Sequence, residues 1–268
     1  MTNLNDRVAI VTGASRGVGR SVALALAKQG CDIVLAAKTV EPHPKLPGTI
    51  LTVAKEVEEL GRRALPVQTD VRFVDQIQAM VGKAADEFGR IDILVNNAGA
   101  AWWHPIEETP EKRFDLVMGV NCKGPFFACQ AVLPHMKENG FGHIINMSPP
   151  IAPEMAAGKI GYMISKFGMT LITHGLSREV ADSNIAVNSL WPVTLIESLA
   201  TINLGLGSPE QWRKSEILAD AAAAICMTGP GDRTGQELMD EDVLREAGMT
   251  DFSHYACVPG SEPMRIPW

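Results

Sequence analysis

The segment YMISK contains two residues with the spacing of an acid–base pair, because Lys166 follows Tyr162 by four positions. On a helix, side chains four residues apart lie about 5–6 Å from each other at Cβ. A tyrosine that acts as a base near pH 7 needs its pKa lowered by about three units, or roughly 4 kcal/mol. A lysine charge about 4 Å away supplies a comparable energy at an effective dielectric constant of about 20. The pair therefore indicates proton transfer, although a half-buried tyrosine beside a surface lysine has the same spacing.

Two further polar residues occupy positions that favour a catalytic role. Ser148 ends the apolar stretch GHIINMS, and Asn121 lies within an expected helix. Asparagine is a poor helix former, so Asn121 suggests a local polar task such as holding a water or kinking the helix. The alternatives are that Ser148 caps a helix and that Asn96 and Asn97, in the segment NNAG, only shape a turn.

The segment TGASRGVG at 12–19 has the composition of a phosphate-binding loop. Gly13 permits a sharp turn, Gly17 lets the backbone approach a phosphate, and Gly19 lets the following helix pack closely. The helix N-terminus then offers free N–H groups and a positive dipole end to a pyrophosphate. Glycines are also ordinary turn residues, but the apolar strand before this loop and the helix after it favour nucleotide binding.

Strand-like and helix-like stretches alternate along the chain, which positions these residues. Strands are expected at 7–12, 32–37, 64–70, 92–99, 142–148, 185–192 and 235–240, and helices at 19–30, 50–61, 75–87, 111–137, 160–180 and 209–227. This order predicts an α/β fold: a single Rossmann-type, doubly wound parallel sheet of about seven strands with helices on both faces. One domain is expected over 1–268, with a C-terminal tail after about 240. Ligands of such sheets bind outside the carboxyl ends of the strands.

Composition limits the partners and the compartment. The 268 residues carry a net charge of −7 with both signs mixed, so neither nucleic acid nor a lipid surface is an expected partner. The five cysteines form no CxxC pair and no Cys/His cluster, so no metal site is expected and a reducing interior fits. The polar start MTNLNDR does not resemble a signal peptide, and no apolar run approaches the ~18 residues of a membrane span. A soluble cytoplasmic protein is expected.

The motifs together resemble those of the short-chain dehydrogenases/reductases, in their single-domain branch, over nearly the whole chain. The matching features are TGASRGVG, Asp70 in TDV, NNAG, Asn121, Ser148, YMISK and WPVT at 191–194. More narrowly, AAKTVEPHPKLPGTI, NMSPP, NSLWPVT and DEDVLREAG…YACVPG resemble the dehydrogenase part of the hydroxysteroid dehydrogenase-like proteins. Two departures stand out: two prolines follow Ser148 and should stiffen the substrate loop, and DEDVLREAG stands where the broader family usually has DGG.

The resemblance implies a catalytic role for four residues. Tyr162 would be the general acid in carbonyl reduction and the base in alcohol oxidation. Lys166 would lower the pKa of this tyrosine and bind the nicotinamide ribose. Ser148 would hydrogen-bond the substrate oxygen, and Asn121 would hold a water in a proton relay. In such a hydride transfer the cofactor carries the chemistry, while the protein positions the reactants and supplies the proton.

The resemblance also implies the contacts with a nicotinamide dinucleotide. Asp70 would meet the adenine amino group, Asn97 the adenosine-side backbone region, and Thr194 the nicotinamide carboxamide or phosphates. The implied cofactor-binding residues are Gly13, Ser15, Arg16, Gly17, Val18, Gly19, Lys38, Asp70, Val71, Asn97, Ala98, Gly99, Tyr162, Lys166, Pro192 and Thr194.

The end of the second expected strand favours NADP(H) over NAD(H) as the cofactor. Relatives that prefer NAD place an acid at this tip, and Ala37 stands there. Lys38 and, from the glycine loop, Arg16 suit a 2′-phosphate of roughly −1.5 to −2 charges. NAD remains the alternative cofactor, because a Glu41 carboxylate folded inward could bind the ribose hydroxyls. The alternative for Lys38 is that it lies in a solvated loop and does not contact the cofactor.

The loop at 38–48 contains Pro42, Pro44 and Pro47. Three prolines predict a stiff flap over the adenosine end of the cofactor, which would bring His43 or Lys45 near.

Apolar side chains gather in the loops that follow the strands, which predicts an apolar carbonyl or alcohol as the substrate. They are Trp102, Trp103, Ile151, Met155, Trp191, Leu195, Ile196 and Leu199. Some of the tryptophans could instead pack at a subunit contact. A homodimer or homotetramer is expected, since the resembled family pairs its 111–137 and 160–180 helices across two-fold axes.

Two other functions compete with an NADP(H)-dependent carbonyl reductase or alcohol dehydrogenase. A non-catalytic nucleotide-binding module that senses redox state typically lacks the tyrosine or the lysine, and both are present. A sugar-nucleotide epimerase or dehydratase also uses YxxxK, but such chains have GxxGxxG spacing and a longer substrate domain.

Overall fold

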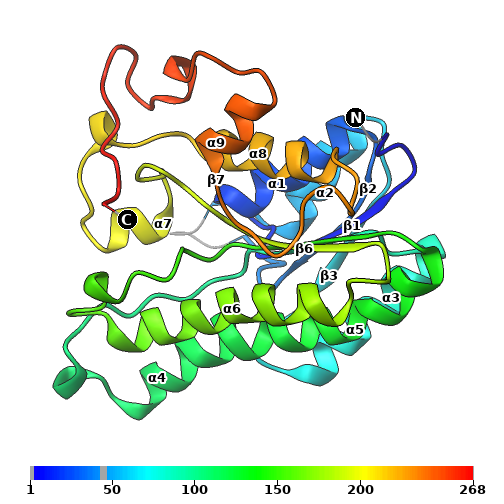
Figure 1. Cartoon of the computed structure of the whole chain (residues 1–268), viewed down its shortest axis with the longest axis horizontal. Coiled ribbons are helices and arrows are strands. Elements are labelled where there is room, and N and C mark those ends of the chain that lie inside the picture. Colours follow the sequence, from blue (N-terminus) through cyan, green and yellow to red (C-terminus); the bar gives the residue numbers. More distant parts are fainter. Residues whose placement is uncertain (1–2, 43–46, 268) are drawn as a thin grey trace.

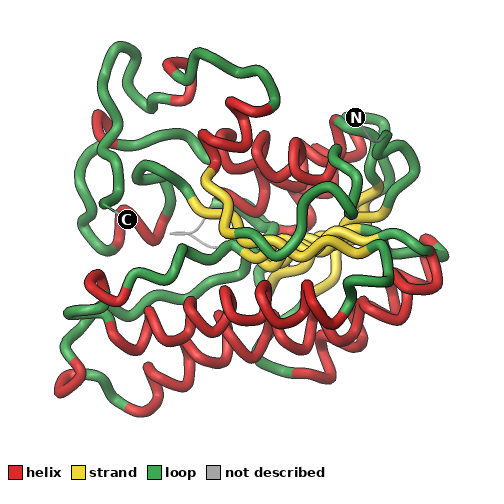
Figure 2. Tube along the Cα trace, viewed as in Figure 1, coloured by secondary structure: helices red, strands yellow, loops and turns green. Residues whose placement is uncertain are grey.

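The computed structural model describes residues 3–42 and 47–267, and the strands of this part form one parallel sheet. The sheet has the order β3-β2-β1-β4-β5-β6-β7 (Figures 1 and 2). Its strands are β1 (Val8–Thr12), β2 (Asp32–Ala37), β3 (Ala64–Gln68), β4 (Ile93–Asn96), β5 (Gly142–Asn146), β6 (Ile185–Trp191) and β7 (Glu237–Met239). The predicted α/β fold with about seven parallel strands is confirmed, and each strand lies within the range expected for it.

Helices cover both faces of the sheet (Figure 1). One face carries α1 (Gly17–Lys28), α2 (Ile50–Glu59) and α8 (Glu216–Cys226), with α9 (Asp240–Glu246) packed against α8. The other face carries α3 (Val74–Phe88), α4 (Glu111–Met118), α5 (Gly124–Asn139) and α6 (Ile160–Glu179). The short α7 (Leu199–Asn203) follows β6. Sequence reasoning missed α7 and α9, and the expected helix at 209–227 is a 3₁₀ turn at Pro209–Gln211 followed by α8.

The sheet reverses its winding between β1 and β4. From β1 the chain builds outward through β2 and β3, and then crosses back to place β4 on the other side of β1. In β1, β4 and β5 every residue is buried, as expected for strands covered by helices on both faces. The loops that leave β1 and β4 diverge at their carboxyl ends, so a crevice is expected there.

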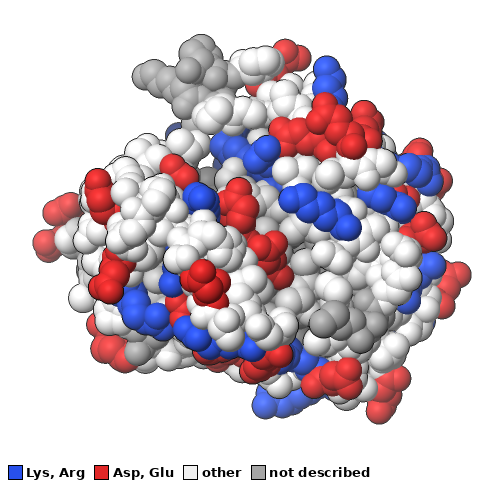
Figure 3. Space-filling model, turned by 90° about the horizontal axis from the view of Figure 1, so that it is seen from above, with Lys and Arg blue, Asp and Glu red and all other residues white. Residues whose placement is uncertain are grey.

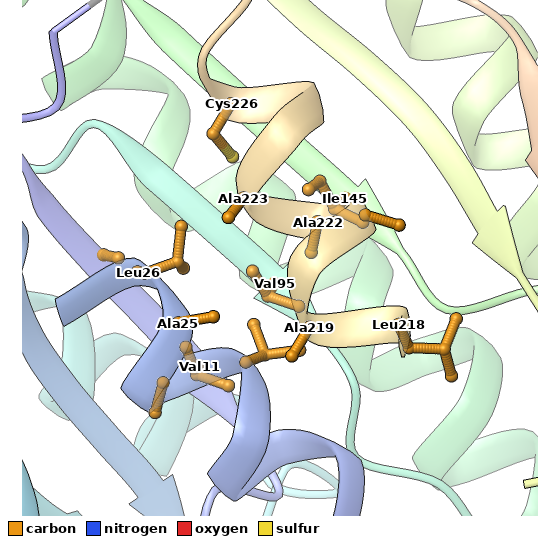
Figure 4. Packing of buried hydrophobic residues seen from close by; sticks show 14 of the residues in the cluster. Val11, Ala25, Leu26, Val95, Ile145, Leu218, Ala219, Ala222, Ala223 and Cys226 are labelled. Atoms are coloured by element: carbon orange, nitrogen blue, oxygen red, sulfur yellow. The ribbon is translucent and has the colours of Figure 1, made fainter. Parts of the chain in front are cut away.

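Small side chains let α8 approach α1 closely. Ala219, Ala222 and Ala223 of α8 face Ala25 and Leu26 of α1 above the sheet, and all five are buried (Figure 4). Alanines place little bulk between the two helix backbones, so the two helices can pack closely. This packing fixes α1, and the glycine loop at its start is fixed with it.

The longest helical run satisfies a length and composition test for a membrane span. An 18-residue window within Glu111–Asn139 passes this test, which the sequence analysis does not predict, and 44% of this window is buried inside the protein. The run consists of α4, a π-helical turn and α5, and it packs against α3, α6 and the strands β4 and β5. Its apolar side chains therefore have a place in the core of this fold.

Charged side chains of both signs are interspersed on the face shown in Figure 3. Among the described residues on that face, the basic side chains form no continuous patch, and acidic groups lie between them. The five cysteines are free thiols, and those of Cys31, Cys129 and Cys226 are buried in the core.

Candidate active site

A cavity of about 460 Å³ lies at the carboxyl ends of the strands. It is lined by the glycine loop, by the loops after β4, β5 and β6, and by the first turns of α6. Its volume falls within the usual range for small-molecule sites, about 300–1,000 Å³. The crevice expected at the reversal of winding is therefore present, and the residues predicted to do chemistry can be located relative to it.

Ten of the predicted site residues line this cavity together. They are Arg16, Gly17, Val18, Gly19, Asn97, Gly99, Tyr162, Lys166, Pro192 and Thr194. Eight others lie outside the lining: Gly13, Ser15, Lys38, Asp70, Val71, Ala98, Asn121 and Ser148.

Tyr162 and Lys166 face the cavity from the first two turns of α6. Lys166 is buried, and its Nζ donates a hydrogen bond of 2.6 Å to the carbonyl oxygen of Met147 at the end of β5. Loss of water around the ammonium lowers the pKa of Lys166 to about 8. Burial likewise raises the pKa of the Tyr162 hydroxyl above its ordinary value. The sequence predicts that Lys166 lowers this pKa, whereas in the structure the loss of hydration around the hydroxyl raises it.

A buried polar network holds the first turn of α6 against the loop after β4. Asn121 donates from Nδ2 to Ala100 O (2.8 Å) and to Ser165 Oγ (2.9 Å), and its Oδ1 accepts from Ala100 N (2.8 Å). Ser165 Oγ in turn donates to the carbonyl oxygen of Tyr162 at 2.6 Å. Asn121 lies in the π-helical turn Gly119–Lys123, so the helix is interrupted at this residue. The Asn121 amide thus links the backbone of Ala100 to Ser165, which is bonded to the backbone carbonyl of Tyr162.

Ser148 does not reach the cavity. Its hydroxyl is fully buried, donates to Ser189 Oγ at 3.0 Å, and accepts from Thr170 Oγ1 at 3.2 Å. The residue that lines the cavity here is Pro149, which has no hydrogen-bond donor. This is a correction to the role that the resemblance implied, because the structure does not place the serine hydroxyl where Tyr162 would meet a substrate oxygen. The proline pair in SPP was the sequence signal for this difference.

The glycine loop packs as its spacing required. Gly13 has φ +69°, and a Cβ on it would lie 2.9 Å from the Cα of Ala98. A Cβ on Gly19 would lie 2.4 Å from the carbonyl oxygen of Gly13. Gly17 has φ +53° and has no atom within 4 Å of a built Cβ, so its backbone borders open space in the cavity. Asn97 fastens the loop by donating from Nδ2 to Thr12 O at 2.8 Å.

Arg16 connects the glycine loop to the end of the 38–48 loop. Its Nε donates to Pro47 O at 2.9 Å and its Nη2 to Gly48 O at 3.1 Å. A Cβ on Gly48 would lie 2.5 Å from Ser15 O, so the two loops are in close contact. Lys38 is exposed directly beyond β2. The predicted roles of His43, Pro44 and Lys45 lie outside the described residues.

Asp70 makes an ion pair in the loop directly after β3. Arg72 Nη2 approaches Asp70 Oδ2 to 2.6 Å, and the hydrogen bonds from Arg72 hold the pKa of this carboxyl below its usual range. Val71 is buried against Gly124. Neither residue lines the cavity, so the adenine contact remains a prediction.

The C-terminal tail returns to complete the cavity wall, which sequence reasoning missed. Ile266 lines the cavity, and its N–H donates to Val193 O at 2.8 Å. Arg265 pairs with Thr194 in an antiparallel bridge, and Figure 1 shows the C-terminal end beside α7. No local pattern in residues 261–267 indicates this contact, since it depends on where the loop after β6 lies.

Most of the predicted apolar residues line the cavity. Trp103, Met155, Trp191, Leu195, Ile196 and Leu199 do so, whereas Trp102 and Ile151 do not. Trp102 stacks on His104, with ring centroids 4.1 Å apart. Lining residues that the sequence reading missed include Pro149, Lys159, Leu204, Leu206, Leu218 and Ile266.

The residues present fit a nicotinamide dinucleotide. The Oγ1 of Thr194 is buried at the cavity wall and has no hydrogen-bond partner within the described chain. A buried hydroxyl without a partner is costly, so it indicates a bound polar group. The lining contributes the cations Arg16, Lys159 and Lys166, and none of its described residues is acidic. An anionic ligand with polar groups along its length suits these contacts.

Comparison with known proteins places the chain in a family. The family profile described as short chain dehydrogenase matches residues 7–200, and the chain belongs to this family. It is 46% identical over 253 residues to the human hydroxysteroid dehydrogenase-like protein 2, a match that covers 93% of this chain and 60% of the human protein. The chain thus spans about 60% of the length of the curated relatives it matches. The resemblance seen in the motifs is confirmed.

Two solved structures show the same fold. A short chain dehydrogenase of Mycobacterium thermoresistibile has a TM-score of 0.92 and 44% identity, covering 99% of this chain and 95% of that one. A metagenomic short-chain oxidoreductase in complex with NADP has a TM-score of 0.75 and 27% identity, covering 89% and 98%.

Proposed function

We propose that the chain catalyses the NADP(H)-dependent interconversion of a carbonyl and a secondary alcohol on an apolar small molecule. The observation that carries this proposal is the convergence of Tyr162, Lys166, the glycine loop and Thr194 on one cavity with an apolar end. A redox-sensing module would need no acid beside the substrate end, so the position of Tyr162 favours an enzyme.

The chain's own residues have tasks in carbonyl reduction. The Tyr162 hydroxyl is protonated at neutral pH, because tyrosine ordinarily titrates near ~10 and burial raises its pKa further, so it can donate to a carbonyl oxygen. Lys166 holds its ammonium beside the end of β5 through Met147 O, and its charge favours the tyrosinate that remains after donation. The bound cofactor supplies the hydride. Since Ser148 points away, Tyr162 acts in this proposal without a serine donor at the substrate oxygen.

The proposed preference for NADP(H) rests on charges at the adenosine end. Ala37 ends β2 without an acidic group, and the exposed Lys38 follows it. Arg16 uses two of its five N–H donors on the 47–48 backbone, which leaves others for a phosphate. A charged hydrogen bond contributes about 1.5–3 kcal/mol, or about 10- to 150-fold in affinity. The metagenomic relative solved with NADP is consistent with this choice.

The test of the reaction is the oxidation of NADPH, followed at 340 nm with a panel of aromatic, long-chain and small polar carbonyl compounds. Wild type should turn over the apolar members fastest, and Tyr162→Phe should abolish turnover because only the hydroxyl is removed. Calorimetric titration of Tyr162→Phe with NADPH serves as the control, and binding should persist. Wild-type kcat in the mutant would refute tyrosine catalysis.

The test of cofactor choice compares kcat/KM for NADPH and NADH. Lys38→Ala should lower the NADPH preference about 10- to 150-fold, as expected for one charged hydrogen bond. Ala37→Asp should shift the preference toward NADH, because a carboxylate there repels the 2′-phosphate. A wild type that favours NADH, or two mutants with unchanged preference, would overturn the assignment of Lys38.

A homodimer or homotetramer is part of the proposal. Large apolar side chains are exposed on the outer surface of α4, α5 and α6: Phe114 (38%), Phe126 (52%), Ile164 (48%) and Leu171 (59%). Such a set favours burial against another copy. Light scattering at micromolar concentration should give a multiple of the chain mass, and a monomer would contradict the proposal.

A further inference from the structure

A third cation lies at the substrate end of the cavity. Lys159 directly precedes α6 and lines the cavity three residues before Tyr162. Its Nζ lies 4.5 Å from the centroid of the Trp103 ring. The Trp103 ring is in turn 5.9 Å from the ring of Tyr162. The ammonium of Lys159 and the hydroxyl-bearing ring of Tyr162 thus both lie near the indole of Trp103, on the same side of the cavity.

No protein group neutralises this charge in the described part of the chain. Across residues 3–42 and 47–267, no carboxylate lies within 4.0 Å of Lys159 Nζ, and the ammonium donates no hydrogen bond there. Partial burial lowers the pKa of Lys159. The face of Trp103 offsets only part of the lost hydration. Lys159 is half-buried and has no counter-ion among the described residues, so its ammonium is available to an anionic group of a ligand in the cavity.

The position of Lys159 separates it from the cofactor's phosphates. Those phosphates are expected at the glycine loop, where Arg16 and the start of α1 lie. Lys159 instead contacts Trp103, on the side where Tyr162 would meet the substrate. The other cation of the lining, Lys166, is already bonded to Met147 O. Lys159 is therefore the lining cation that faces the substrate without another role.

We propose that the substrate carries a carboxylate, and that this group pairs with Lys159 while the carbonyl meets Tyr162. The inference rests on the proposed function and narrows it, from apolar carbonyl compounds to oxo acids with an apolar body. The body would lie against Trp103, Met155 and Leu195, which line the same end of the cavity. In the reverse direction the substrate would be the corresponding hydroxy acid.

The test compares each acid with its neutral ester. The probes are 4-oxooctanoate and 6-oxooctanoate with their methyl esters, reduced with NADPH by wild type, Lys159→Gln and Lys159→Arg. In wild type at least one acid should have a KM about 10- to 150-fold below that of its ester, as expected for a charged hydrogen bond. Lys159→Gln should bring this ratio close to one, and Lys159→Arg should retain most of it. Lys83→Gln, at an exposed position of α3, is the matched control and should keep the wild-type ratio.

Two further measurements separate this inference from the proposed function. Raising the salt concentration should increase the KM of the acid and leave that of the ester, since screening acts on the charge pair. Calorimetric titration of Tyr162→Phe, loaded with NADPH, should show the same preference for the acid without any turnover. If no carbonyl compound is reduced, the proposed function fails, and the titration still decides the role of Lys159. Equal binding of acid and ester to Tyr162→Phe, or an unchanged ratio in Lys159→Gln, would overturn the inference.

Discussion

The buried amine of Lys166 sets a limit on the pH range of the proposed reaction. Its pKa is lowered to about 8 by burial, so the amine loses its charge as the pH rises through that value. The pKa of Tyr162 is raised, so the tyrosine keeps its proton over the same range. We expect kcat/KM for carbonyl reduction to be level near neutral pH and to fall above about 8, with the fall reporting Lys166 rather than Tyr162.

Lys166→Arg tests this assignment, because arginine does not lose its proton in this range. Whatever activity the variant retains should show no fall near pH 8. The measurement is a pH profile of kcat/KM with NADPH and a saturating-cofactor control at each pH. A fall at the same pH in the arginine variant would assign the titration to another group.

Ser148 provides a second prediction for a single residue. Ser148→Ala removes a buried hydroxyl bonded to Ser189 and Thr170, and leaves these partners short of one hydrogen bond. The free energy of unfolding should fall by about 1–3 kcal/mol in urea titrations, while kcat is retained. Tyr162→Phe should instead lose kcat and keep its free energy of unfolding. Loss of kcat in Ser148→Ala with an unchanged free energy of unfolding would show that Ser148 takes part in catalysis.

The side-chain direction of Ser148 is the part of the site that the sequence could not determine. The motif places Ser148 at the carboxyl edge of the sheet, and this placement was correct. Its hydroxyl points inward because Ser189 on β6 and Thr170 on α6 lie there, and both are distant in sequence. By contrast, the spacing of Tyr162 and Lys166 on one helix was sufficient to bring both to the cavity.

At the scale of elements, the start of α1 depends on the absence of a side chain at Gly19. A Cβ there would lie 2.4 Å from Gly13 O and 2.5 Å from Asn97 Nδ2. Gly19→Ala should therefore displace the glycine loop, weaken cofactor binding and lower the free energy of unfolding by about 1–3 kcal/mol. Thermal denaturation and titration with NADPH measure both effects.

Gly82 in α3 is the matched control for this substitution. No atom lies within 4 Å of a Cβ built on Gly82, and its φ lies outside the left-handed region. Gly82→Ala should raise stability by about 0.5–1 kcal/mol, because alanine suits a helix interior better. Equal effects of the two substitutions would mean that the contact at Gly19 is not the cause.

Elements with buried apolar periodicity were predictable, and those held by distant contacts were not. The strands stand out as apolar runs because helices bury both of their faces. The expected helix at 209–227 breaks after Gln211 because Trp212 is buried and donates from Nε1 to Leu206 O at 2.7 Å. α7 has only five residues, too few for a periodic signal.

At the scale of the whole molecule, a cluster of charges around the buried Glu241 reaches the C-terminal tail through the exposed side chain of Arg265. Glu241 at the start of α9 is 2% exposed and lies 2.5 Å from Arg213 Nη1 and 3.2 Å from Arg265 Nη1. Arg213 is also buried, and Arg265 belongs to the tail beside Thr194. The cluster thus links the segment before α8, α9 and the cavity wall.

Glu241→Gln should weaken the contact between α9 and the C-terminal tail, and it should also lower the stability of the protein. It leaves Arg213 buried without its carboxylate, a change that typically costs about 3–5 kcal/mol of unfolding free energy. Because Ile266 follows Arg265 and lines the cavity, the KM for the carbonyl substrate should also rise. Urea denaturation and initial rates measure these two effects.

Glu246→Gln is the control. It breaks an ion pair between Arg233 and the largely exposed carboxylate of Glu246, and exposed pairs contribute about 0–1 kcal/mol. A Glu241→Gln protein as stable as Glu246→Gln would show that the tail is held by its backbone contacts to Val193 and Leu195 instead.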